Sequence, residues 1–241
     1  MKLRSGIAAL ALLSVSLLAV GTAQASLQLQ SSVIVVDAGE GEGVISLKNK
    51  SESPVLLHSA VVDIAEDSEP LLLVTPPITR VDPGDTQMVR FILKNEGAGR
   101  PVERLRRATF EGIPQAAPGV VSIAVRQNIP VIIRPKGLKP NSTPWALLQW
   151  RRTASGLSVT NAGAYVVRMA PELSLASGGA SLSLPRTYIL PGETLEVPAA
   201  TALAATEQIS FRPASLNGYL LEPVQAALAA PDAAKAALAA P

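Results

Sequence analysis

The most constraining feature of this 241-residue chain is a long alternating segment, VVSIAVRQNIPVIIRP, at residues 120–135. Val121, Ile123 and Val125 alternate with small or polar residues, and the same apolar phase resumes at Ile129. Alternation with a period of two and β-branched side chains indicates a β-strand, here of about 13 residues against a usual length of about 5–6.

Pro130 lies inside this segment. Proline has no N–H to donate, so a proline in mid-strand indicates an edge strand or a bulge. A long apolar edge is hazardous for a soluble protein, because its unpaired backbone groups template pairing with other chains. Either another part of the fold covers this edge, or pairing with another chain is its function.

Residues 1–25 have the three parts of a secretory signal peptide. Lys2 and Arg4 form a positive start, an apolar run covers Gly6–Gly21, and Ala23-Gln24-Ala25 matches a cleavage site. A membrane anchor is the alternative, but the apolar run is short and ends at the cleavage site. We therefore expect an exported, soluble mature chain that begins at Ser26.

The charge balance and the absence of cysteine exclude several classes of function. Lys2 and Arg4 are two of the 21 basic residues, so the mature chain has as many basic as acidic residues, 19 of each. This balance argues against a nucleic-acid-binding surface. Without cysteine there is no disulfide, thiol nucleophile or thiolate metal site. Stability must come from packed apolar cores.

The first part of the mature chain has the pattern of an antiparallel sandwich of immunoglobulin-like size, with about seven short strands and turns every 8–12 residues or so. Residues 103–113 fit a short helix by propensity, but the spacing of Ala108, Phe110 and Gly112 also fits a strand. The other predicted strands are Ser31–Val36, Gly43–Asn49, Val55–Ile64, Leu71–Val74, Gln87–Leu93 and the long segment described above.

A second set of predicted strands follows the linker Lys136–Pro144 and extends from Ala146 to Val224. It predicts a second, smaller sandwich. The tail Ala226–Pro241 consists almost wholly of Ala, Leu and Pro, and we predict that it is disordered. The expected organisation is therefore all-β, with a signal peptide (1–25), an N-terminal domain (26–138), a C-terminal domain (139–225) and a tail (226–241).

Residues that could carry catalysis or bind a cofactor are sparse. His58 is the single histidine, no Gly-x-Ser-x-Gly nucleophile motif occurs, and no spacing suggests carboxylates converging on a metal. The segment Gly39–Gly43 (GEGEG) carries two glutamates that would repel phosphate, and we interpret it as a hairpin turn. We expect neither an enzyme nor a protein with a cofactor or a small-molecule substrate.

The densest charge lies at residues 103–107, Glu-Arg-Leu-Arg-Arg. It is either a solvated face or a site where one arginine anchors a carboxylate, because guanidinium binds carboxylate through a two-pronged fork. Arg134 ends the long strand. We favour an ion pair between Arg134 and Glu103 that braces the junction between the domains.

Several segments together resemble the PapD-like periplasmic chaperones of chaperone–usher pili. Residues 74–84 (VTPPITRVDPG), followed by Met-Val-Arg at 88–90, resemble the family's Thr-Pro-Pro and Pro-Gly segment. Residues 110–114 (FEGIP) resemble a strand end that closes with Ile-Pro. Residues 121–138 resemble the family's subunit-binding edge strand. Residues 156–161 and 190–193 are similar to turns in the second half.

The resemblance implies two immunoglobulin-like domains arranged in an L. It also implies that the chain lends an edge strand to a pilus subunit that lacks its own last strand, and delivers the subunit to an outer-membrane usher. Main-chain hydrogen bonds provide affinity in such an arrangement, and alternate side chains enter pockets of the partner. Those side chains would be Val121, Ile123, Val125 and Ile129.

The resemblance has one departure. Family members place an Arg in the first strand and a Lys in the edge strand to hold the subunit's C-terminal carboxylate, and the matching positions are Val33 and Pro130. The Ile129-Pro130-Val131 step and an Arg on the preceding strand near Glu103 resemble the family's divergent archaic branch, in which a neighbouring strand supplies the anchor. On that basis Arg107 is the first candidate and Arg106 the second.

An alternative function is a structural or adhesive fibre component that shares the sandwich fold. Such a subunit would carry an N-terminal extension of alternating residues that it donates to the next subunit. Residues 26–36 are too short for that role and are followed directly by a turn, so we favour the chaperone.

Overall fold

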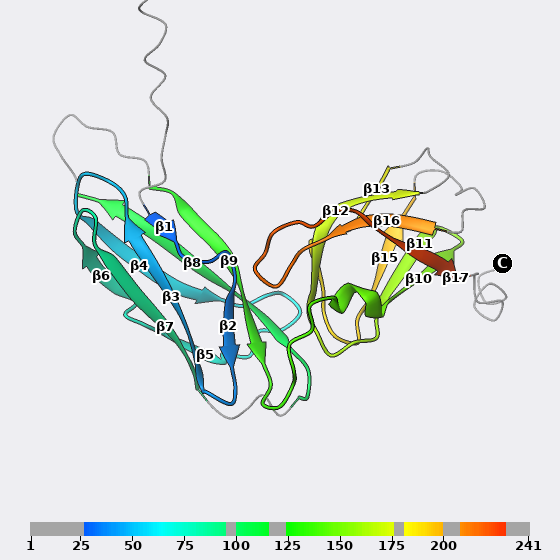
Figure 1. Cartoon of the computed structure of the whole chain (residues 1–241), viewed down its shortest axis with the longest axis horizontal. Coiled ribbons are helices and arrows are strands. Elements are labelled where there is room, and N and C mark those ends of the chain that lie inside the picture. The colour runs from blue at the N-terminus through cyan, green and yellow to red at the C-terminus, as the bar shows by residue number, and fades with distance from the viewer. Residues whose placement is uncertain (1–26, 95–99, 116–123, 176–180, 200–207, 230–241) are drawn as a thin grey trace, which may run out of the picture.

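The computed structural model describes residues 27–94, 100–115, 124–175, 181–199 and 208–229. They form two β-sandwich domains, which Figure 1 shows set at an angle to one another. The predicted all-β, two-domain fold is therefore confirmed. The predicted signal peptide lies outside the described residues.

The described part of the N-terminal domain contains nine strands. Along the hydrogen-bonded path their order is β5-β7-β3-β2-β9-β8-β4-β6, and β1 pairs with β3. The strands are β1 (Leu27–Leu29), β2 (Ile34–Asp37), β3 (Glu42–Asn49), β4 (Val55–Val62), β5 (Leu72–Thr75), β6 (Ile78–Val81), β7 (Thr86–Leu93), β8 (Arg104–Pro114) and β9 (Arg126–Arg134). The segment that the sequence left open between helix and strand is thus the long strand β8.

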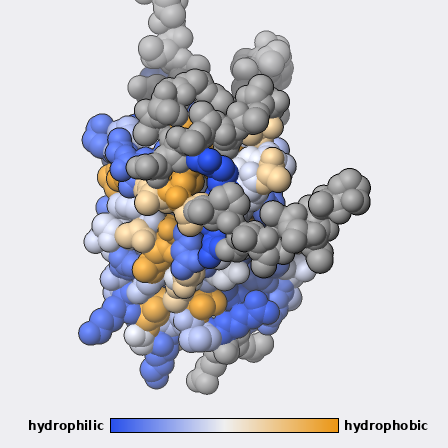
Figure 2. All heavy atoms as spheres, turned by 90° about the vertical axis from the view of Figure 1, so that its right-hand side faces the viewer, coloured by the Kyte–Doolittle hydropathy of each residue, from blue (hydrophilic) through white to orange (hydrophobic). Residues whose placement is uncertain are grey.

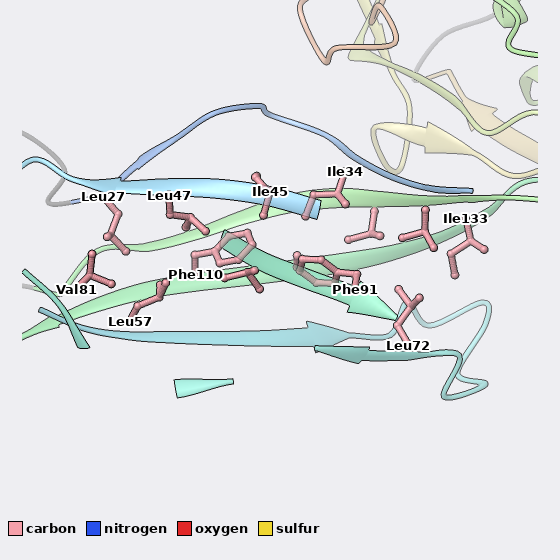
Figure 3. Packing of buried hydrophobic residues seen from close by; sticks show 14 of the residues in the cluster. Leu27, Ile34, Ile45, Leu47, Leu57, Leu72, Val81, Phe91, Phe110 and Ile133 are labelled. Carbon is pink, nitrogen blue, oxygen red and sulfur yellow. The ribbon is translucent and has the colours of Figure 1, made fainter. Parts of the chain in front are cut away.

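The core of this domain lies between two layers of the folded sheet. Ile45 and Leu47 of β3 face Leu57 of β4, as Figure 3 shows. Phe91 of β7 and Phe110 of β8 meet edge-to-face, with ring centroids 6.2 Å apart. Alternating apolar residues in the sequence therefore supply the inner face of each strand.

The C-terminal domain begins with the short 3-10 helix η1 (Pro144–Leu147) and continues as a second sheet with the path β13-β12-β16-β17-β10-β11-β15. Its core is centred on Trp150 and Phe211, whose rings are 5.3 Å apart. The strands are β10 (Leu148–Thr153), β11 (Gly156–Asn161), β12 (Val167–Leu175), β13 (Ser181–Ser183), β14 (Tyr188–Ile189), β15 (Thr194–Pro198), β16 (Gln208–Pro213) and β17 (Val224–Ala229).

The start of the predicted disordered tail is instead part of this sheet. Strand β17 extends to Ala229, four residues beyond the predicted domain end at 225, and pairs with β16 on one side and β10 on the other. Ala226 and Leu228 pack against the core. Pairing on both sides and burial of alternate residues override the weak strand propensity of alanine. Residues 230–241 lie outside the described part of the chain.

The outer face of the C-terminal domain carries both hydrophobic and hydrophilic side chains. Figure 2 shows hydrophobic residues gathered along the middle of the visible face, bordered by hydrophilic ones. Among the described residues, no helix has the length and apolar character needed to cross a membrane.

Candidate functional site

Strand β9 has one half inside the sheet and one half at an edge. From Val131 to Arg134 it lies between β2, which runs parallel, and β8. From Arg126 to Pro130 it pairs with β8, and within the described part of the chain no strand pairs with its other side. The prediction of an edge strand therefore fails for the second half, because β2 covers it.

Pro130 marks the point where the second neighbour begins. Pairing with β2 starts at the next residue, Val131, which lies opposite Ile34. Because proline has no N–H to donate, it is compatible with a position where pairing on one side stops. The sequence signal at Pro130 thus corresponds to the boundary between the covered and the open half of β9.

The alternating side chains of β9 divide in the same way. Val131 and Ile133 are fully buried, and Ile129 is partly buried against the domain's own core. Much of the surface of Ile129, one of the predicted subunit-binding residues, is thus already occupied within the domain. Val125, which precedes β9 in the same phase, is 44% exposed. The other two predicted residues, Val121 and Ile123, lie outside the described residues.

The arginines of β8 point to alternate faces. Arg106 has the phase of the core residues Ala108 and Phe110, and it is completely buried. Its Nη2 atom donates to Asp67 Oδ1 over 2.8 Å, and its Nε atom lies 3.0 Å from Asp63 Oδ1. Arg106 is therefore occupied within its own domain, which argues against its role as an anchor for another chain.

The same carboxylate holds a second arginine. Arg104 donates through Nη2 and Nε to both oxygens of Asp67, over 2.6 and 2.7 Å. Burial of Asp67 opposes ionisation, but hydrogen bonds from Arg104 and Arg106 hold the pKa of its carboxyl well below the usual range. The two arginines thereby tie the loop between β4 and β5 to β8.

Arg107 has the opposite phase and faces the C-terminal domain. It lies opposite Pro130 in the strand register and donates from Nε and Nη2 to the side-chain and backbone oxygens of Asn128, over 2.7 and 2.9 Å. Burial lowers the pKa of Arg107. Its side chain lines a cleft of ≈ 460 Å³ between the two domains.

Arg168 of β12 lines the same cleft from the other domain. No motif in the sequence points to this residue. Its only local signal was a charged position within an otherwise apolar run, Tyr165–Met169. Only the packing of the two domains places it across the cleft from Arg107.

Glu103 connects the two domains just before β8. Its Oε1 atom lies 3.2 Å from Arg134 Nε, and its Oε2 atom accepts a hydrogen bond from the backbone N–H of Val166 over 3.0 Å. The Glu103 N–H donates to the carbonyl oxygen of Ala164 over 2.8 Å. The structure thus brings the predicted pair together. Burial raises the pKa of Glu103 even though Val166 and Arg134 oppose this shift.

Two further contacts join the domains. Glu66 pairs with Arg186 and accepts a hydrogen bond from the hydroxyl of Tyr188 over 2.8 Å. A small apolar cluster fills the junction, with contributions from Val33, Ile64, Leu105 and Ile132 on one side and Val166 on the other. The cleft walls are therefore held by charged, hydrogen-bonded and apolar contacts together.

Two family models match the chain. The model of the pili and flagellar-assembly chaperone, PapD N-terminal domain, matches residues 26–139. The model of the pili assembly chaperone PapD, C-terminal domain, matches residues 143–218. Together they cover the N-terminal domain and the C-terminal domain as far as residue 218, before β17.

Curated relatives agree with these matches. The chain is 36% identical over 197 residues to an uncharacterized fimbrial chaperone, YhcA, of Escherichia coli, covering 79% of this chain and 85% of the relative. It is 30% identical over 193 residues to the chaperone protein FimB/FhaD of Bordetella pertussis, covering 73% and 78%.

Solved structures share the fold. The YadV chaperone aligns with a TM-score of 0.69 at 20% identity, over 84% of this chain and 100% of that one. The Salmonella enterica complex of SafA pilin with the SafB chaperone aligns with a TM-score of 0.69 at 21% identity, over 86% and 98%. With both domains matched in order, the chain belongs to the PapD-like family of pilus assembly chaperones.

Proposed function

We propose that this protein is a periplasmic chaperone that binds pilus subunits by lending them the open edge of β9 and passes them to an outer-membrane usher. The observation that carries the proposal is the half-open β9: among the described residues, no strand pairs with its free side at Arg126–Pro130, beside the exposed Val125. Two related structures support it: SafB is solved with SafA pilin, and CsuC of Acinetobacter baumannii with the CsuE tip adhesion subunit.

The binding reaction would be β-augmentation. A subunit strand would add to the free side of residues 126–130 and of the segment before them, with main-chain hydrogen bonds along the pair. The sequence alternation places Val121, Ile123 and Val125 in the phase that enters the subunit. Each buried Val or Ile contributes roughly 1.5–3 kcal/mol before the cost of ordering.

Arg107 would anchor the end of the subunit. It lies beside Pro130, where β2 closes the open edge, so a strand paired along the free half of β9 would reach the cleft at this point. A terminal carboxylate there would meet a guanidinium that the surrounding protein has partly desolvated, where a charged hydrogen bond is stronger than in water. Assignment to the archaic branch remains a prediction.

The test is a charge introduced on the open edge. Val125→Glu should abolish co-purification with a fimbrial subunit when the subunit genes of the same genome are co-expressed one at a time with the chaperone. The free chaperone should keep its melting temperature, because Val125 is 44% exposed. The complex should fail because a glutamate at position 125 would be buried in the subunit without a partner for its charge.

Val44→Glu is the matched control. Val44 is 50% exposed on β3, away from the open edge, so this variant should retain the subunit. If Val125→Glu holds as much subunit as Val44→Glu, strand donation from this edge is wrong.

A further inference from the structure

Gln127 interrupts the apolar phase of β9 in the middle of its open half. Val125 and Ile129 lie on either side of it in the same phase, and both are apolar. In the strand register Gln127 lies opposite Phe110, whose ring is fully buried in the core of the domain (Figure 3). Directly paired residues of neighbouring strands point to the same face of a sheet. The Gln127 amide therefore points to the core side although it is polar.

One hydrogen bond holds this amide across the open side of the sandwich. Its Nε2 atom donates to the carbonyl oxygen of Leu27 in β1 over 2.8 Å. Within the described residues β1 pairs only with β3, so no strand pairing joins β1 to β9. Gln127 is half-buried, and its Oε1 atom accepts no hydrogen bond from another described residue. The amide thus keeps one acceptor for a partner outside the domain.

Gln127 also marks the boundary between two apolar surfaces. After it in the chain, Ile129 packs against the domain's own core and Val131 is fully buried. Before it, Val125 is 44% exposed. A subunit strand on the open edge would cover Val125, whereas the domain itself already covers much of Ile129. The amide would then lie between the core of the chaperone and the groove of the subunit.

Alternation alone cannot fix where a subunit strand lies along β9. A slip of one residue turns the side chains to the wrong face, but a slip of two residues restores the alternation. Among the described residues of this phase in the open half, Gln127 is the one polar side chain. A slip of two residues would move apolar surface of the subunit onto its amide, and a buried amide without a partner is costly. A single buried polar side chain fixes the register of coiled coils for the same reason.

We propose that Gln127 sets the register of the bound subunit strand and restricts the chaperone to subunits that present a hydrogen-bond donor at this position, an inference that rests on the proposed function. The donor is an N–H or O–H group of the subunit that reaches Gln127 Oε1. The hydrogen bond to Leu27 keeps the amide oriented towards that donor.

Disulfide crosslinking measures the register, because the chain contains no cysteine of its own. Ala124→Cys places a thiol at an exposed position beside the open edge. The probe is a fimbrial subunit of the same genome that co-purifies with the chaperone. It carries one added cysteine, which is moved in steps of two residues along the strand that pairs with β9. Only cysteines that face each other closely form a disulfide. One subunit position should crosslink at least about tenfold more than the positions two residues to either side.

Two substitutions of Gln127 separate its polarity from its contact with Leu27. Gln127→Met keeps the length of the side chain but removes the amide, so the slipped positions should crosslink to within about threefold of the matched one. Gln127→Ser is too short to reach Leu27 but keeps a polar group, so it should retain the single register. A residue that only tethers β1 would give the same result in both variants. Each variant should stay folded, because it loses only one half-buried hydrogen bond.

Arg126→Met is the matched control. Arg126 is the neighbouring residue of the same strand, has the opposite phase and is 64% exposed in an ion pair with Glu111. This variant gains the same apolar side chain outside the phase that enters the subunit. It should therefore retain the single register.

The proposal is refuted if Gln127→Met keeps the single register, or if Gln127→Ser loses it to the same extent as Gln127→Met. It is also refuted if the chain with Gln127 already crosslinks equally at several subunit positions. In each of these cases the proposed function still stands if Val125→Glu abolishes co-purification with the subunit. If Val125→Glu has no effect, strand donation fails instead.

Discussion

Replacing Glu103 by glutamine should cost far less stability than replacing it by alanine. Glu103 is 6% exposed, and its pKa is raised because burial outweighs the help of Val166 and Arg134. A raised pKa means that the folded protein favours the neutral form of this group more than the unfolded chain does. Glutamine resembles that neutral form and still accepts the hydrogen bond from the Val166 N–H.

The magnitudes follow from the contacts. Glu103→Ala removes both carboxylate oxygens. Arg134, which is 11% exposed, then has no carboxylate partner, and the Val166 N–H loses its acceptor. Breaking a buried pair in this way costs about 3–5 kcal/mol. Glu103→Gln keeps one oxygen that accepts from the Val166 N–H but loses the acceptor of Arg134 Nε, and we expect a loss of about 1–2 kcal/mol.

The sign of the pH dependence provides an independent check. A raised folded-state pKa means that the contribution of Glu103 is fully present below the unfolded-state value and is lost as the pH rises through the folded-state value. The difference in stability between the unsubstituted chain and Glu103→Gln should therefore shift in favour of glutamine as the pH rises from about 4.

Urea unfolding at several pH values measures these differences. Circular dichroism follows both domains, and fluorescence follows the C-terminal domain, which contains both tryptophans, Trp145 and Trp150. If Glu103→Gln is as damaging as Glu103→Ala at neutral pH, the argument that burial outweighs pairing at this site is wrong.

Two other predictions concern the N-terminal domain. Asp67→Asn should cost about 3–5 kcal/mol in urea unfolding, because the fully buried Arg106 and the bidentate Arg104 lose their shared carboxylate. Because the pKa of Asp67 is depressed in the folded state, its contribution to stability is present above the ordinary pKa of aspartate and is lost as the pH falls towards the folded-state pKa. On acidification the Asp67→Asn variant should therefore lose less stability than the unsubstituted chain. Equal losses would contradict this prediction. Phe110→Ala should cost about 3–5 kcal/mol in the same assay through the cavity beside Phe91, and a loss under about 1 kcal/mol would contradict the close packing of this core.

Local patterns in the sequence were sufficient for much of the fold. Alternation predicted strands at residues 43–49, 55–64 and 87–93, because one face of each must meet a core. The same alternation left residues 103–113 open between helix and strand, since propensity and periodicity disagreed there. Pairing with β4 and β9 on both sides decides for a strand.

The candidate site was predictable only in part. The open edge next to Pro130 and the proximity of Glu103 to Arg134 followed from the residues and from the family resemblance. The sequence could not show which of Arg106 and Arg107 is buried and which lines the cleft. Adjacent strand residues face opposite sides, and the sequence does not say which side is the core. The only local sign of Arg168 was a charged position within an apolar run.

By itself the sequence determined the all-β class, the positions of most strands along the chain and the family, because these depend on alternation, turn residues and short motifs that are local along the chain. Tertiary structure alone decided that β2 covers half of β9, that an alanine-rich segment becomes β17, and that Arg107 and Arg168 face one cleft. Each of these depends on segments far apart in the sequence meeting in space. Contacts between distant segments follow from how whole sheets and domains pack, so they cannot be predicted from a local sequence pattern.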